Sequence, residues 1–475
     1  MSKTRRIYRL SPSQLSAETI AVTFAKTSRS PESFDVIASE LDEEKSSKFS
    51  EKWIVGYGHA SVAEHAVLHL ALENVSRLAI ETIEGNRLAS YTEKSTRYQE
   101  WDSDAFVIPE EMHGTELEKL YQETVRNLFE TYAYALPYLR KWAEAKFPIN
   151  QGESQKAWQN RTRVIAIDVC RFILPAASMA NVGVTMNARA LEYAIKKMLS
   201  SQLAEVRAIG QEVKQVATQE LPTLVKYATP IDNLDQIQTV YAGAANQTNN
   251  AIKKPWIQLL HFDPEGELKV LAALLFRFGM QGYQSCLDQV HKLSEKERQH
   301  LVGQLFMNAG DFDVPLRELE YTSYKFEALM DQGAYFEFKR HRMMSQTAQP
   351  LTATLGFSLP RAISEAGVED VFVRAMRNAA QTYQQIVKEI PPVASYVVPN
   401  AFNRRVLFEL NLRELFHFSK LRCNENAHFS IRRVGRAMLE LIAEHHPLFL
   451  PYICVRADES SEQITSEYFS SVNMD

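Results

Sequence analysis

The chain has 475 residues, of which 45% are hydrophobic and 23% charged, and its formal net charge at pH 7 is -5. This composition is typical of a folded globular protein, and the length predicts two large domains or about three smaller ones. The negative charge excludes long-range attraction to nucleic acid or to an anionic membrane, so any phosphate must be bound by a local arginine cluster.

The cysteines and the N-terminus indicate the compartment. Four cysteines lie far apart and form no CxxC pair, which argues against a disulfide framework and against a thiolate zinc site. The basic N-terminus is not followed by an apolar stretch, and no run of about 18 apolar residues occurs elsewhere. We therefore expect a cytoplasmic protein without a metal centre or a membrane span.

Two parts of the chain carry the same succession of predicted elements. Residues 67–73 alternate between apolar and polar side chains, which predicts a strand, and residues 76–87 have helical spacing. The succession recurs at residues 320–326 and 331–342. The chain is therefore expected to contain two copies of one structural unit.

Each predicted helix ends in a polar triplet, and the two triplets differ. The second helix ends in Arg340-His341-Arg342, whereas the first ends in Gly85-Asn86-Arg87. The first triplet is followed by Ser95-x-Arg97-Tyr98, whereas the matching positions of the second copy hold Pro350 and Thr352. Clustered guanidinium groups match phosphate oxygens in bidentate geometry, although an isolated triplet of this kind is more often an exposed basic helix end. Each copy contains half of a candidate phosphate site.

A second pair of matching segments lies further along each copy. Asn187-Ala-Arg189 and Asn411-Leu-Arg413 both open long segments with helical periodicity. Arg87 and Arg342 are 255 positions apart, whereas Arg189 and Arg413 are 224 apart, so the first copy has about 31 additional residues. We predict that they lie near residues 146–158.

Turn residues without strong periodicity at residues 227–235 predict the boundary between the copies. We divide the chain into a first repeat, residues 1–235, which carries the Ser-x-Arg-Tyr loop, and a second repeat, residues 236–475, which carries the Arg-His-Arg triplet. The polar and acidic residues from 457 onward predict a frayed tail.

Together these motifs resemble the flavin-dependent thymidylate synthases. The family signature is Arg-His-Arg, seven residues and Ser-x-Arg-Tyr, preceded by His-x-Ser/Thr-x-x-Glu-His and followed by Asn-x-Arg and a further Arg. In the first repeat the matching residues are His59, Ser61, Glu64, His65, Arg87, Ser95, Arg97, Tyr98, Arg171, Asn187 and Arg189. In the second they are Glu320, Arg340, His341, Arg342, Asn411, Arg413, His417, Leu421 and Arg422. The resemblance implies an α/β (α+β) fold of two tandem repeats, each with a mixed or antiparallel sheet and long helices.

Each repeat departs from the family pattern at different positions. Met198 stands at the place of the catalytic Arg in the first repeat, and Ser395 replaces the phosphate-binding Arg in the second. Family members are homotetramers that build each site between subunits, so the two repeats could together assemble one full site. The opposite combination, with Gly85, Met198, Pro350 and Ser395, is expected to be vestigial. A homodimer of this chain would then reproduce the four-domain assembly.

The resemblance also implies roles for single residues. FAD would be held by Arg340, His341, Arg342, Asn411, Arg413 and His417, with Ser61 and Glu64 completing the pocket. The nucleotide substrate would be bound by Glu93, Lys94, Ser95, Thr96, Arg97, Arg171, Glu337 and Arg340. Arg422 would be catalytic, because a guanidinium against the uracil edge stabilises the charge that develops as N3 ionises.

The implied reaction is the methylation of dUMP to dTMP, with methylenetetrahydrofolate and NADPH as co-substrates. One residue argues against dUMP as the substrate. Glu337 stands where the family usually has Gln, and an ionised acid only accepts hydrogen bonds. Two alternatives therefore remain. The chain could catalyse a flavin-dependent modification of another pyrimidine nucleotide, or it could be a catalytically silent relative that binds nucleotide or flavin.

Overall fold

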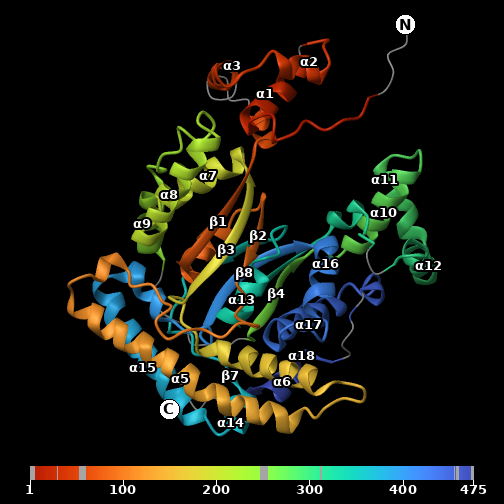
Figure 1. Cartoon of the computed structure of the whole chain (residues 1–475). Helices are drawn as coiled ribbons and strands as arrows, with labels where there is room; N and C mark the ends of the chain where they lie inside the picture. The colour runs from red at the N-terminus through yellow and green to blue at the C-terminus, as the bar shows by residue number, and fades with distance from the viewer. Residues whose placement is uncertain are drawn as a thin grey trace.

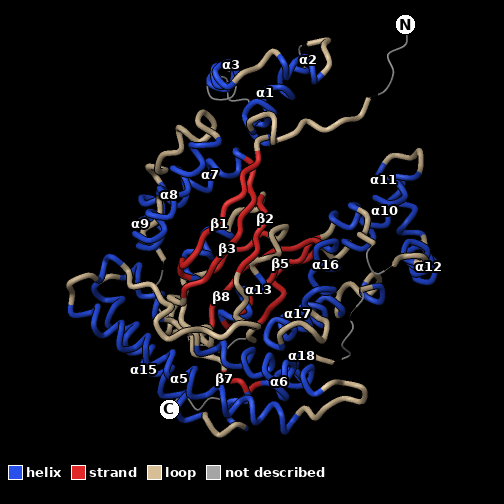
Figure 2. The backbone as a smooth tube through the Cα atoms, viewed as in Figure 1, coloured by secondary structure: helices blue, strands red, loops and turns tan. Residues whose placement is uncertain are grey.

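The computed structural model describes residues 6–28, 30–52, 60–245, 255–310, 313–453, 455 and 459–471. Strands lie at the centre and helices surround them (Figure 1; Figure 2). His59 of the predicted histidine motif lies outside the described residues. Within the described part of the chain, no helix combines the length and the apolar character needed to cross a bilayer.

The first repeat forms a three-stranded antiparallel sheet with the order β1-β3-β2. Its strands are β1 (Val67–Ser76), β2 (Ala89–Glu93) and β3 (Met179–Asn187). Two helices follow strands directly, α4 (Arg77–Glu84) after β1 and α7 (Ala188–Leu199) after β3. Because β1 and β2 both run antiparallel to β3, they end at the same edge of the sheet, where α4 begins.

The second repeat forms a four-stranded antiparallel sheet with the order β4-β5-β8-β6. Its strands are β4 (Ile257–Phe262), β5 (Ser323–Asp331), β6 (Ser345–Ala348) and β8 (Asn403–Asn411). The helices that follow strands are α13 (Gln332–Phe338) after β5 and α16 (Leu412–Arg422) after β8. The order β5-β8-β6 repeats the order β1-β3-β2, and β4 is added at one edge.

The helix starts confirm that the two sheets are copies of one unit. Ser76 caps α4 by accepting a hydrogen bond from the Ala79 N–H, and Asp331, 255 positions after Ser76, caps α13 in the same way. Asn187 and Asn411, 224 positions apart, cap α7 and α16. Such caps satisfy a free N–H of the first turn and stabilise a helix by about 1 kcal/mol. Spacings of 255 and 224 therefore define equivalent positions in the two repeats.

Long helices accompany the sheets. α5 (Glu116–Lys146) packs against α15 (Glu369–Glu389), and the hydroxyls of Thr124 and Thr382 form a 2.8 Å hydrogen bond between them. In the first repeat α6 (Gln155–Cys170) follows α5, whereas α15 leads directly into the short 3-10 helix η6 (Pro391–Val397). The additional residues of the first repeat therefore lie in the longer α5, the loop after it and α6.

The remaining elements complete the two repeats. In the first they are α1 (Ala17–Thr27), α2 (Phe34–Ser39), α3 (Glu43–Phe49), η2 (Ala60–His65), η3 (Glu110–Met112), η4 (Arg171–Ile173), α8 (Ala204–Glu220) and α9 (Leu234–Ala244). In the second they are α10 (Gly266–Phe278), α11 (Tyr283–Lys292), α12 (Glu295–Phe306), η5 (Arg317–Tyr321), α14 (Arg361–Glu365), α17 (Phe429–Ala443) and η7 (Leu450–Tyr452). The boundary at residue 235, which falls inside α9, stays a prediction.

The two repeats meet about a pseudo-twofold axis. Pro175 and Pro399, at equivalent positions, pair in an isolated antiparallel bridge. The Ala176 N–H donates to the Val398 carbonyl at 3.0 Å, and the symmetry-related bond from the Asn400 N–H to the first repeat has the same length. The larger hydrophobic core contains residues of both repeats. The repeats therefore share one core and fold against each other.

A buried ion pair connects the repeats across the same axis. Glu84 and Lys339 are 255 positions apart, and their carboxylate and ammonium groups lie 2.8 Å from each other, with 5% and 6% of the side chains exposed. In a symmetric homodimer, a residue beside the twofold axis faces the same residue of the other subunit, so the two side chains would carry the same charge. In the tandem chain the two positions carry opposite charges.

Three expectations need correction. The strand expected at residues 320–326 begins later, because residues 317–321 form the 3-10 helix η5 and β5 starts at Ser323. The helices expected to continue to Arg87 and Arg342 end at Glu84 and Phe338, so each triplet lies after its helix, the second one in the turn that follows α13. The frayed tail is also wrong: α18 (Ser461–Tyr468) and β9 (Phe469–Ser470) dock against the fold, where β9 pairs with β7 (Leu359–Pro360). Its polar surface faces solvent, while Ile464 is fully buried.

Candidate active site

The Arg-His-Arg triplet projects from the turn after α13. Lys339 ends this helix, and the His341 N–H closes the turn by donating to the Phe338 carbonyl at 3.1 Å. All seven residues of α13 are buried, since the helix packs against α17 and against β5 and β8. This packing fixes the turn beside the first repeat.

Glu93, at the end of β2, joins the triplet to the first repeat. Its carboxylate lies 2.9 Å from Arg340 of the triplet and 2.9 Å from Arg77 at the start of α4. Burial alone would raise the pKa of Glu93, but the charges of Arg77, Lys339 and Arg340 hold this pKa below its ordinary value. The carboxylate is therefore ionised, and 45% of the Arg340 side chain still faces solvent.

Arg97 is held by α6 and by the second repeat. Its Nε and Nη2 donate to both carboxylate oxygens of Asp168 at 2.8 to 3.1 Å. Its Nη1 and Nη2 also lie 3.3 Å from the Asn426 carbonyl. Ser95 Oγ accepts the Arg97 N–H at 3.1 Å, which forms a tight turn in the loop. The predicted phosphate loop is thus anchored at its arginine end.

The other loop residues are positioned by the first repeat. The Lys94 N–H donates to the Asn181 carbonyl of β3 at 2.9 Å, and its ammonium lies 4.7 Å from the centre of the Trp101 ring. Thr96 is buried, whereas Tyr98 is half exposed. The loop therefore contains both buried side chains, such as Thr96, and side chains near the surface, such as Lys94 and Tyr98.

Glu337 lies at the centre of the arginines. Its Oε1 accepts from Arg171 Nη2 and its Oε2 accepts from Arg422 Nη1, each at 3.1 Å. Arg171 comes from η4 of the first repeat and Arg422 from the end of α16. Burial alone would raise the pKa of Glu337, but the charges of Arg171, Arg97 and Arg422 outweigh it and lower this pKa. One ionised carboxylate therefore joins a guanidinium of each repeat.

His341 links the triplet to Arg422. Arg422 Nε donates to His341 Nε2 at 2.9 Å, so Nε2 must be unprotonated. Nδ1 then carries the proton and donates to Glu414 Oε1 at 3.2 Å. Burial, together with the charges of Arg422 and His417, holds the pKa of His341 well below its ordinary value. The imidazole is a neutral ring that orients the guanidinium of Arg422.

We define the composite site by the charged residues and the histidine that meet here: Arg77, Glu93, Arg97, Asp168, Arg171, Glu337, Arg340, His341 and Arg422. It contains five arginines and three carboxylates, which leaves two positive charges uncompensated. Arg171 is 3% exposed, and its Nε has no hydrogen-bond acceptor and lies 3.7 Å from Asp168. The site thus has both the charge and a free buried donor for an anionic ligand.

Arg342 of the triplet contacts protein instead of facing the composite site. Its Nη1 donates to the carbonyls of Arg87, at 2.5 Å, and Ala89. Arg87 in turn donates to the Met344 carbonyl at 2.9 Å. Arg87 and Arg342 are equivalent positions, as are Ala89 and Met344, so the two bonds are related by the pseudo-twofold axis. This reciprocal contact gives a structural reason for an arginine at the third triplet position of both repeats.

The other predicted flavin residues lie along α16 or at the far end of the first sheet. Asn411 caps α16, Arg413 pairs with Glu320 at 3.0 Å, and the His417 ring is exposed 5.6 Å from the His341 ring. Ser61 and Glu64 lie in η2, before the start of β1, whereas the composite site lies beyond its end. Glu64 pairs there with Arg189. The structure thus brings His341 and His417 together and leaves Ser61 and Glu64 apart from them within one chain.

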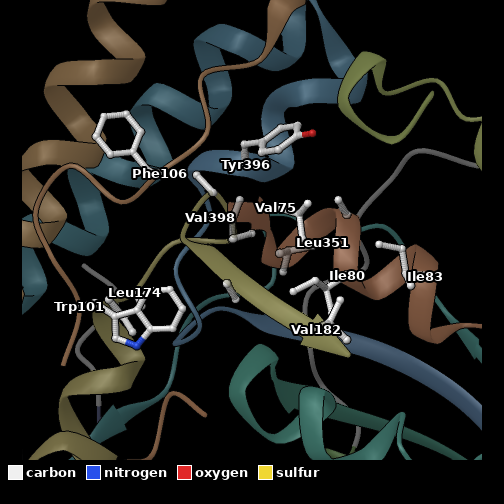
Figure 3. Packing of buried hydrophobic residues seen from close by; sticks show 14 of the residues in the cluster. Val75, Ile80, Ile83, Trp101, Phe106, Leu174, Val182, Leu351, Tyr396 and Val398 are labelled. Atoms are coloured by element: carbon white, nitrogen blue, oxygen red, sulfur yellow. The ribbon is translucent and has the colours of Figure 1, made fainter. Parts of the chain in front are cut away.

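The mirror position consists of the residues equivalent to the composite site, namely Thr82, Gly85, Asn86, Met198, Gln332, Ala348, Thr352, Pro392 and Ser395. Met198, at the place of Arg422, is 4% exposed. Leu351, which directly precedes Thr352, is 2% exposed, and both residues belong to the large core. Leu351 lies beside Val75 in the apolar cluster of Figure 3. Ser395, at the place of Arg171, donates to the Leu351 carbonyl at 2.7 Å. The core side chain of Met198 therefore takes the place of Arg422, and Gln332, which takes the place of Arg77, is bound by Glu81 and Arg404.

Four residues of this region were not predicted: Arg77, Asp168, Glu414 and His428. Asp168 stands three residues before Arg171 in a helical segment. This spacing is visible in the sequence, and it favours an ion pair between the two side chains. His428 is buried and lies 3.3 Å from the Asp168 carbonyl, and no local pattern indicates this contact. Such residues are found only when the fold brings distant segments together.

A family model described as thymidylate synthase complementing protein matches residues 10–223 and 258–448. The chain belongs to this family. A UPF0159 protein of Chlamydia muridarum is 29% identical to it over 437 residues, which cover 88% of this chain and 83% of the relative. A UPF0159 protein of Thermoplasma acidophilum is 27% identical over 455 residues, 86% of this chain and 88% of the relative.

Proteins named flavin-dependent thymidylate synthase match a shorter part of the chain. That of Clostridium tetani is 29% identical over 215 residues, 45% of this chain and 82% of the relative, and that of Pyrococcus furiosus is 33% identical over 201 residues, 42% and 68%. A solved structure of the Helicobacter pylori enzyme, complexed with FAD and dUMP, is 21% identical, covers 42% of this chain and 100% of its own, and has a TM-score of 0.31. The predicted family and fold class are confirmed, and the chain is an enzyme of this family or a close relative.

Proposed function

We propose that this chain methylates dUMP to dTMP at the composite site, with FAD as cofactor and with methylenetetrahydrofolate and NADPH as co-substrates. The observation that carries the proposal is the convergence of Arg97 and Arg171 from the first repeat with Arg340 and Arg422 from the second, around Glu337. Relatives named flavin-dependent thymidylate synthase align with 45% and 42% of the chain. Two such lengths correspond to the two repeats that supply the site.

The phosphate of the nucleotide would be bound by Arg171, Arg97 and the loop from Glu93 to Thr96. A phosphate monoester carries about two negative charges near neutral pH, which matches the two uncompensated positive charges of the composite site. Arg171 supplies a buried Nε–H without an acceptor. Because such a donor costs free energy while unpaired, binding of an anion beside it is favoured.

Arg422 would act on the base. Its Nε is engaged by His341 and its Nη1 by Glu337, so the guanidinium plane is fixed before a ligand arrives. A preorganised cation against the uracil edge stabilises the negative charge that forms when N3 loses its proton. The neutral state of His341 leaves that positive charge on Arg422 alone.

FAD would lie along the exposed side of the triplet. Arg340 keeps 45% of its side chain exposed and His417 is exposed, so these two residues can donate to a dinucleotide. Asn411, Arg413 and Arg342 already have protein partners, and Ser61 and Glu64 lie at the far end of β1. We therefore propose that a second copy of the chain completes the flavin pocket in a homodimer. When bound, flavin would supply the redox chemistry of the methylene transfer.

A second candidate substrate is another pyrimidine nucleotide. Glu337 favours it, because an ionised carboxylate in this position accepts hydrogen bonds and selects a base with a donor facing it. We also propose a cytoplasmic location, which is supported by the three free, buried thiols Cys170, Cys286 and Cys423.

Tritium release from C5-labelled dUMP in the presence of methylenetetrahydrofolate and NADPH tests the reaction. We expect release together with a visible flavin absorbance band in the purified protein. A coloured protein without release from dUMP would favour the second nucleotide. A colourless protein that binds no added flavin would show that the chain is a silent relative.

A further inference from the structure

Glu337 has an unusual position for a buried acid, because its two oxygens are shared between two arginines that the proposed nucleotide also needs. Oε1 accepts from Arg171 Nη2 and Oε2 from Arg422 Nη1, both at 3.1 Å. The residue is 8% exposed. Asp168, the acid beside Arg171, is already bound by three hydrogen bonds from Arg97. Glu337 is therefore the anion that Arg171 and Arg422 share, and its single charge offsets one of their two positive charges.

A phosphate that enters the site needs the same donors. Bidentate binding of an anion by a guanidinium uses two adjacent N–H groups, and Arg171 has Nη2 engaged with Glu337 while Nε is free. Nη2 carries two N–H groups and can donate to both anions, but a phosphate bound there lies next to the negative charge of Glu337 and is repelled by it until the carboxylate turns away. For the carboxylate to turn away, the Glu337 side chain has to change its rotamer.

We propose that Glu337 is an internal anion that occupies Arg171 and Arg422 in the free protein and competes with the nucleotide for them. This inference rests on the proposed function, which places a nucleotide phosphate at Arg171. Substrate and product both have to displace the same carboxylate. The competition weakens binding of each by the same factor, so it raises KM and shortens the residence of the product on the enzyme.

The opposite role is that Glu337 holds the two arginines in position for the ligand. The two roles predict changes of opposite sign when the charge is removed. If Glu337 competes with the ligand, loss of its charge strengthens anion binding. If it positions the arginines, loss of its charge lets them drift and weakens anion binding.

The test is the isosteric variant Glu337→Gln in the full-length protein, with the dissociation constants of inorganic phosphate and of dUMP measured by titration calorimetry. We expect both to fall by at least about tenfold, which equals about 1.4 kcal/mol. KM for dUMP should fall with them, while kcat stays constant or decreases because product leaves more slowly. Unchanged or weaker binding of phosphate would overturn the proposal.

Two further variants complete the design. Glu337→Asp keeps the charge but is one methylene shorter, so it can reach only one of the two arginines and should give an intermediate affinity. Glu81→Gln is the matched control, because Glu81 also forms an ion pair with a mostly buried arginine, Arg404, at 2.7 Å, outside the composite site. It should leave both dissociation constants unchanged.

The phosphate measurement separates this inference from the proposed function. If phosphate binds more tightly to Glu337→Gln while no tritium is released from dUMP by the wild type, the inference holds and the reaction is wrong. If dUMP turns over but the variant binds phosphate no more tightly, the reaction holds and the inference is wrong.

Discussion

The composite site and the mirror position are made of equivalent residues from the same two repeats, yet the first has a net positive charge and the residues of the second are uncharged. Arg422 of the composite site corresponds to Met198, and Arg171 corresponds to Ser395. Two uncompensated positive charges lie on one side of the pseudo-twofold axis, while Met198 and Leu351 are packed in the core on the other. The same backbone arrangement therefore supports two opposite environments.

The difference shows what tandem duplication permits. In a symmetric assembly of identical subunits every site must keep every residue, because one gene encodes all copies. In a tandem chain the positions of one repeat can change without changing the other. Once the mirror position lost its charges, apolar side chains could fill it, and each such burial stabilises the fold by about 1.5 to 3 kcal/mol.

The largest expected effect is on turnover. Arg422→Ala or Arg97→Ala should lower kcat by about 10² to 10³-fold, since each removes a preorganised donor of the composite site. Met198→Leu and Thr352→Ala, at the mirror position, should change kcat by less than about twofold, because the first conserves core volume and the second is at the surface of the filled region. Tritium release from dUMP measures all four variants. Comparable losses on both sides would break the comparison between the two regions.

The next largest effect concerns the pair on the pseudo-twofold axis. Glu84→Lys or Lys339→Glu alone places two like charges in a buried contact and should destabilise the protein by about 3 to 5 kcal/mol. The double exchange restores opposite charges and should recover most of this loss. Urea unfolding of the four proteins gives the coupling free energy. If the double variant is as unstable as the sum of the single variants, the two groups are not in contact.

A smaller effect is expected at Leu351. Leu351→Ala should lower the free energy of unfolding by about 2 to 4 kcal/mol, because it opens a cavity in the core. The dissociation constant of inorganic phosphate should not change, since Leu351 is not one of the residues of the composite site. Calorimetric unfolding and titration on the same sample measure the two quantities. A change in phosphate affinity without a loss of stability would mean that the mirror position is a second binding site.

The smallest effect distinguishes the two roles of the third triplet arginine. Arg87→Ala and Arg342→Ala each remove the two hydrogen bonds of the side chain to the opposite repeat and should each cost about 1 kcal/mol of stability. Equal losses, with flavin content unaltered in both, would assign these arginines to the contact between repeats. Loss of flavin in Arg342→Ala alone would assign Arg342 to the cofactor, as the resemblance implies.

Much of the fold was predictable because its signals are local. The strand beginning at Val67 and the helices after Asn187 and Asn411 were found from alternation and helical periodicity. The ends of elements were less predictable. The helix of the triplet stops at Phe338 although helical spacing continues, because Arg340 and Arg342 gain partners on β2 and just before it only if the chain leaves the helix there.

The candidate site was predictable in part, because several of its residues belong to motifs that can be recognised in the sequence. Arg97, Arg171, Arg340 and Arg422 were selected by comparing the two repeats with each other and with a family pattern, and they do converge. Of their acidic partners, Glu93 and Glu337 were selected as well, whereas Asp168 was not, and neither was Glu414 beside His341. Asp168 and Glu414 have meaning only as neighbours of Arg97 and His341, and those contacts join segments about 70 positions apart. The ordered C-terminal segment was missed because a polar sequence does not show that Ile464 is buried against the rest of the fold.

The sequence by itself determined the duplication, the equivalence of positions 255 and 224 residues apart, and the opposite losses in the two repeats, because these are properties of residue order. Only the tertiary structure decided that Glu337 joins Arg171 to Arg422, that Glu84 meets Lys339, and that Leu351 is buried beside the mirror position. The physical reason is that charge compensation and packing depend on distances of a few ångströms between segments that are far apart in the chain.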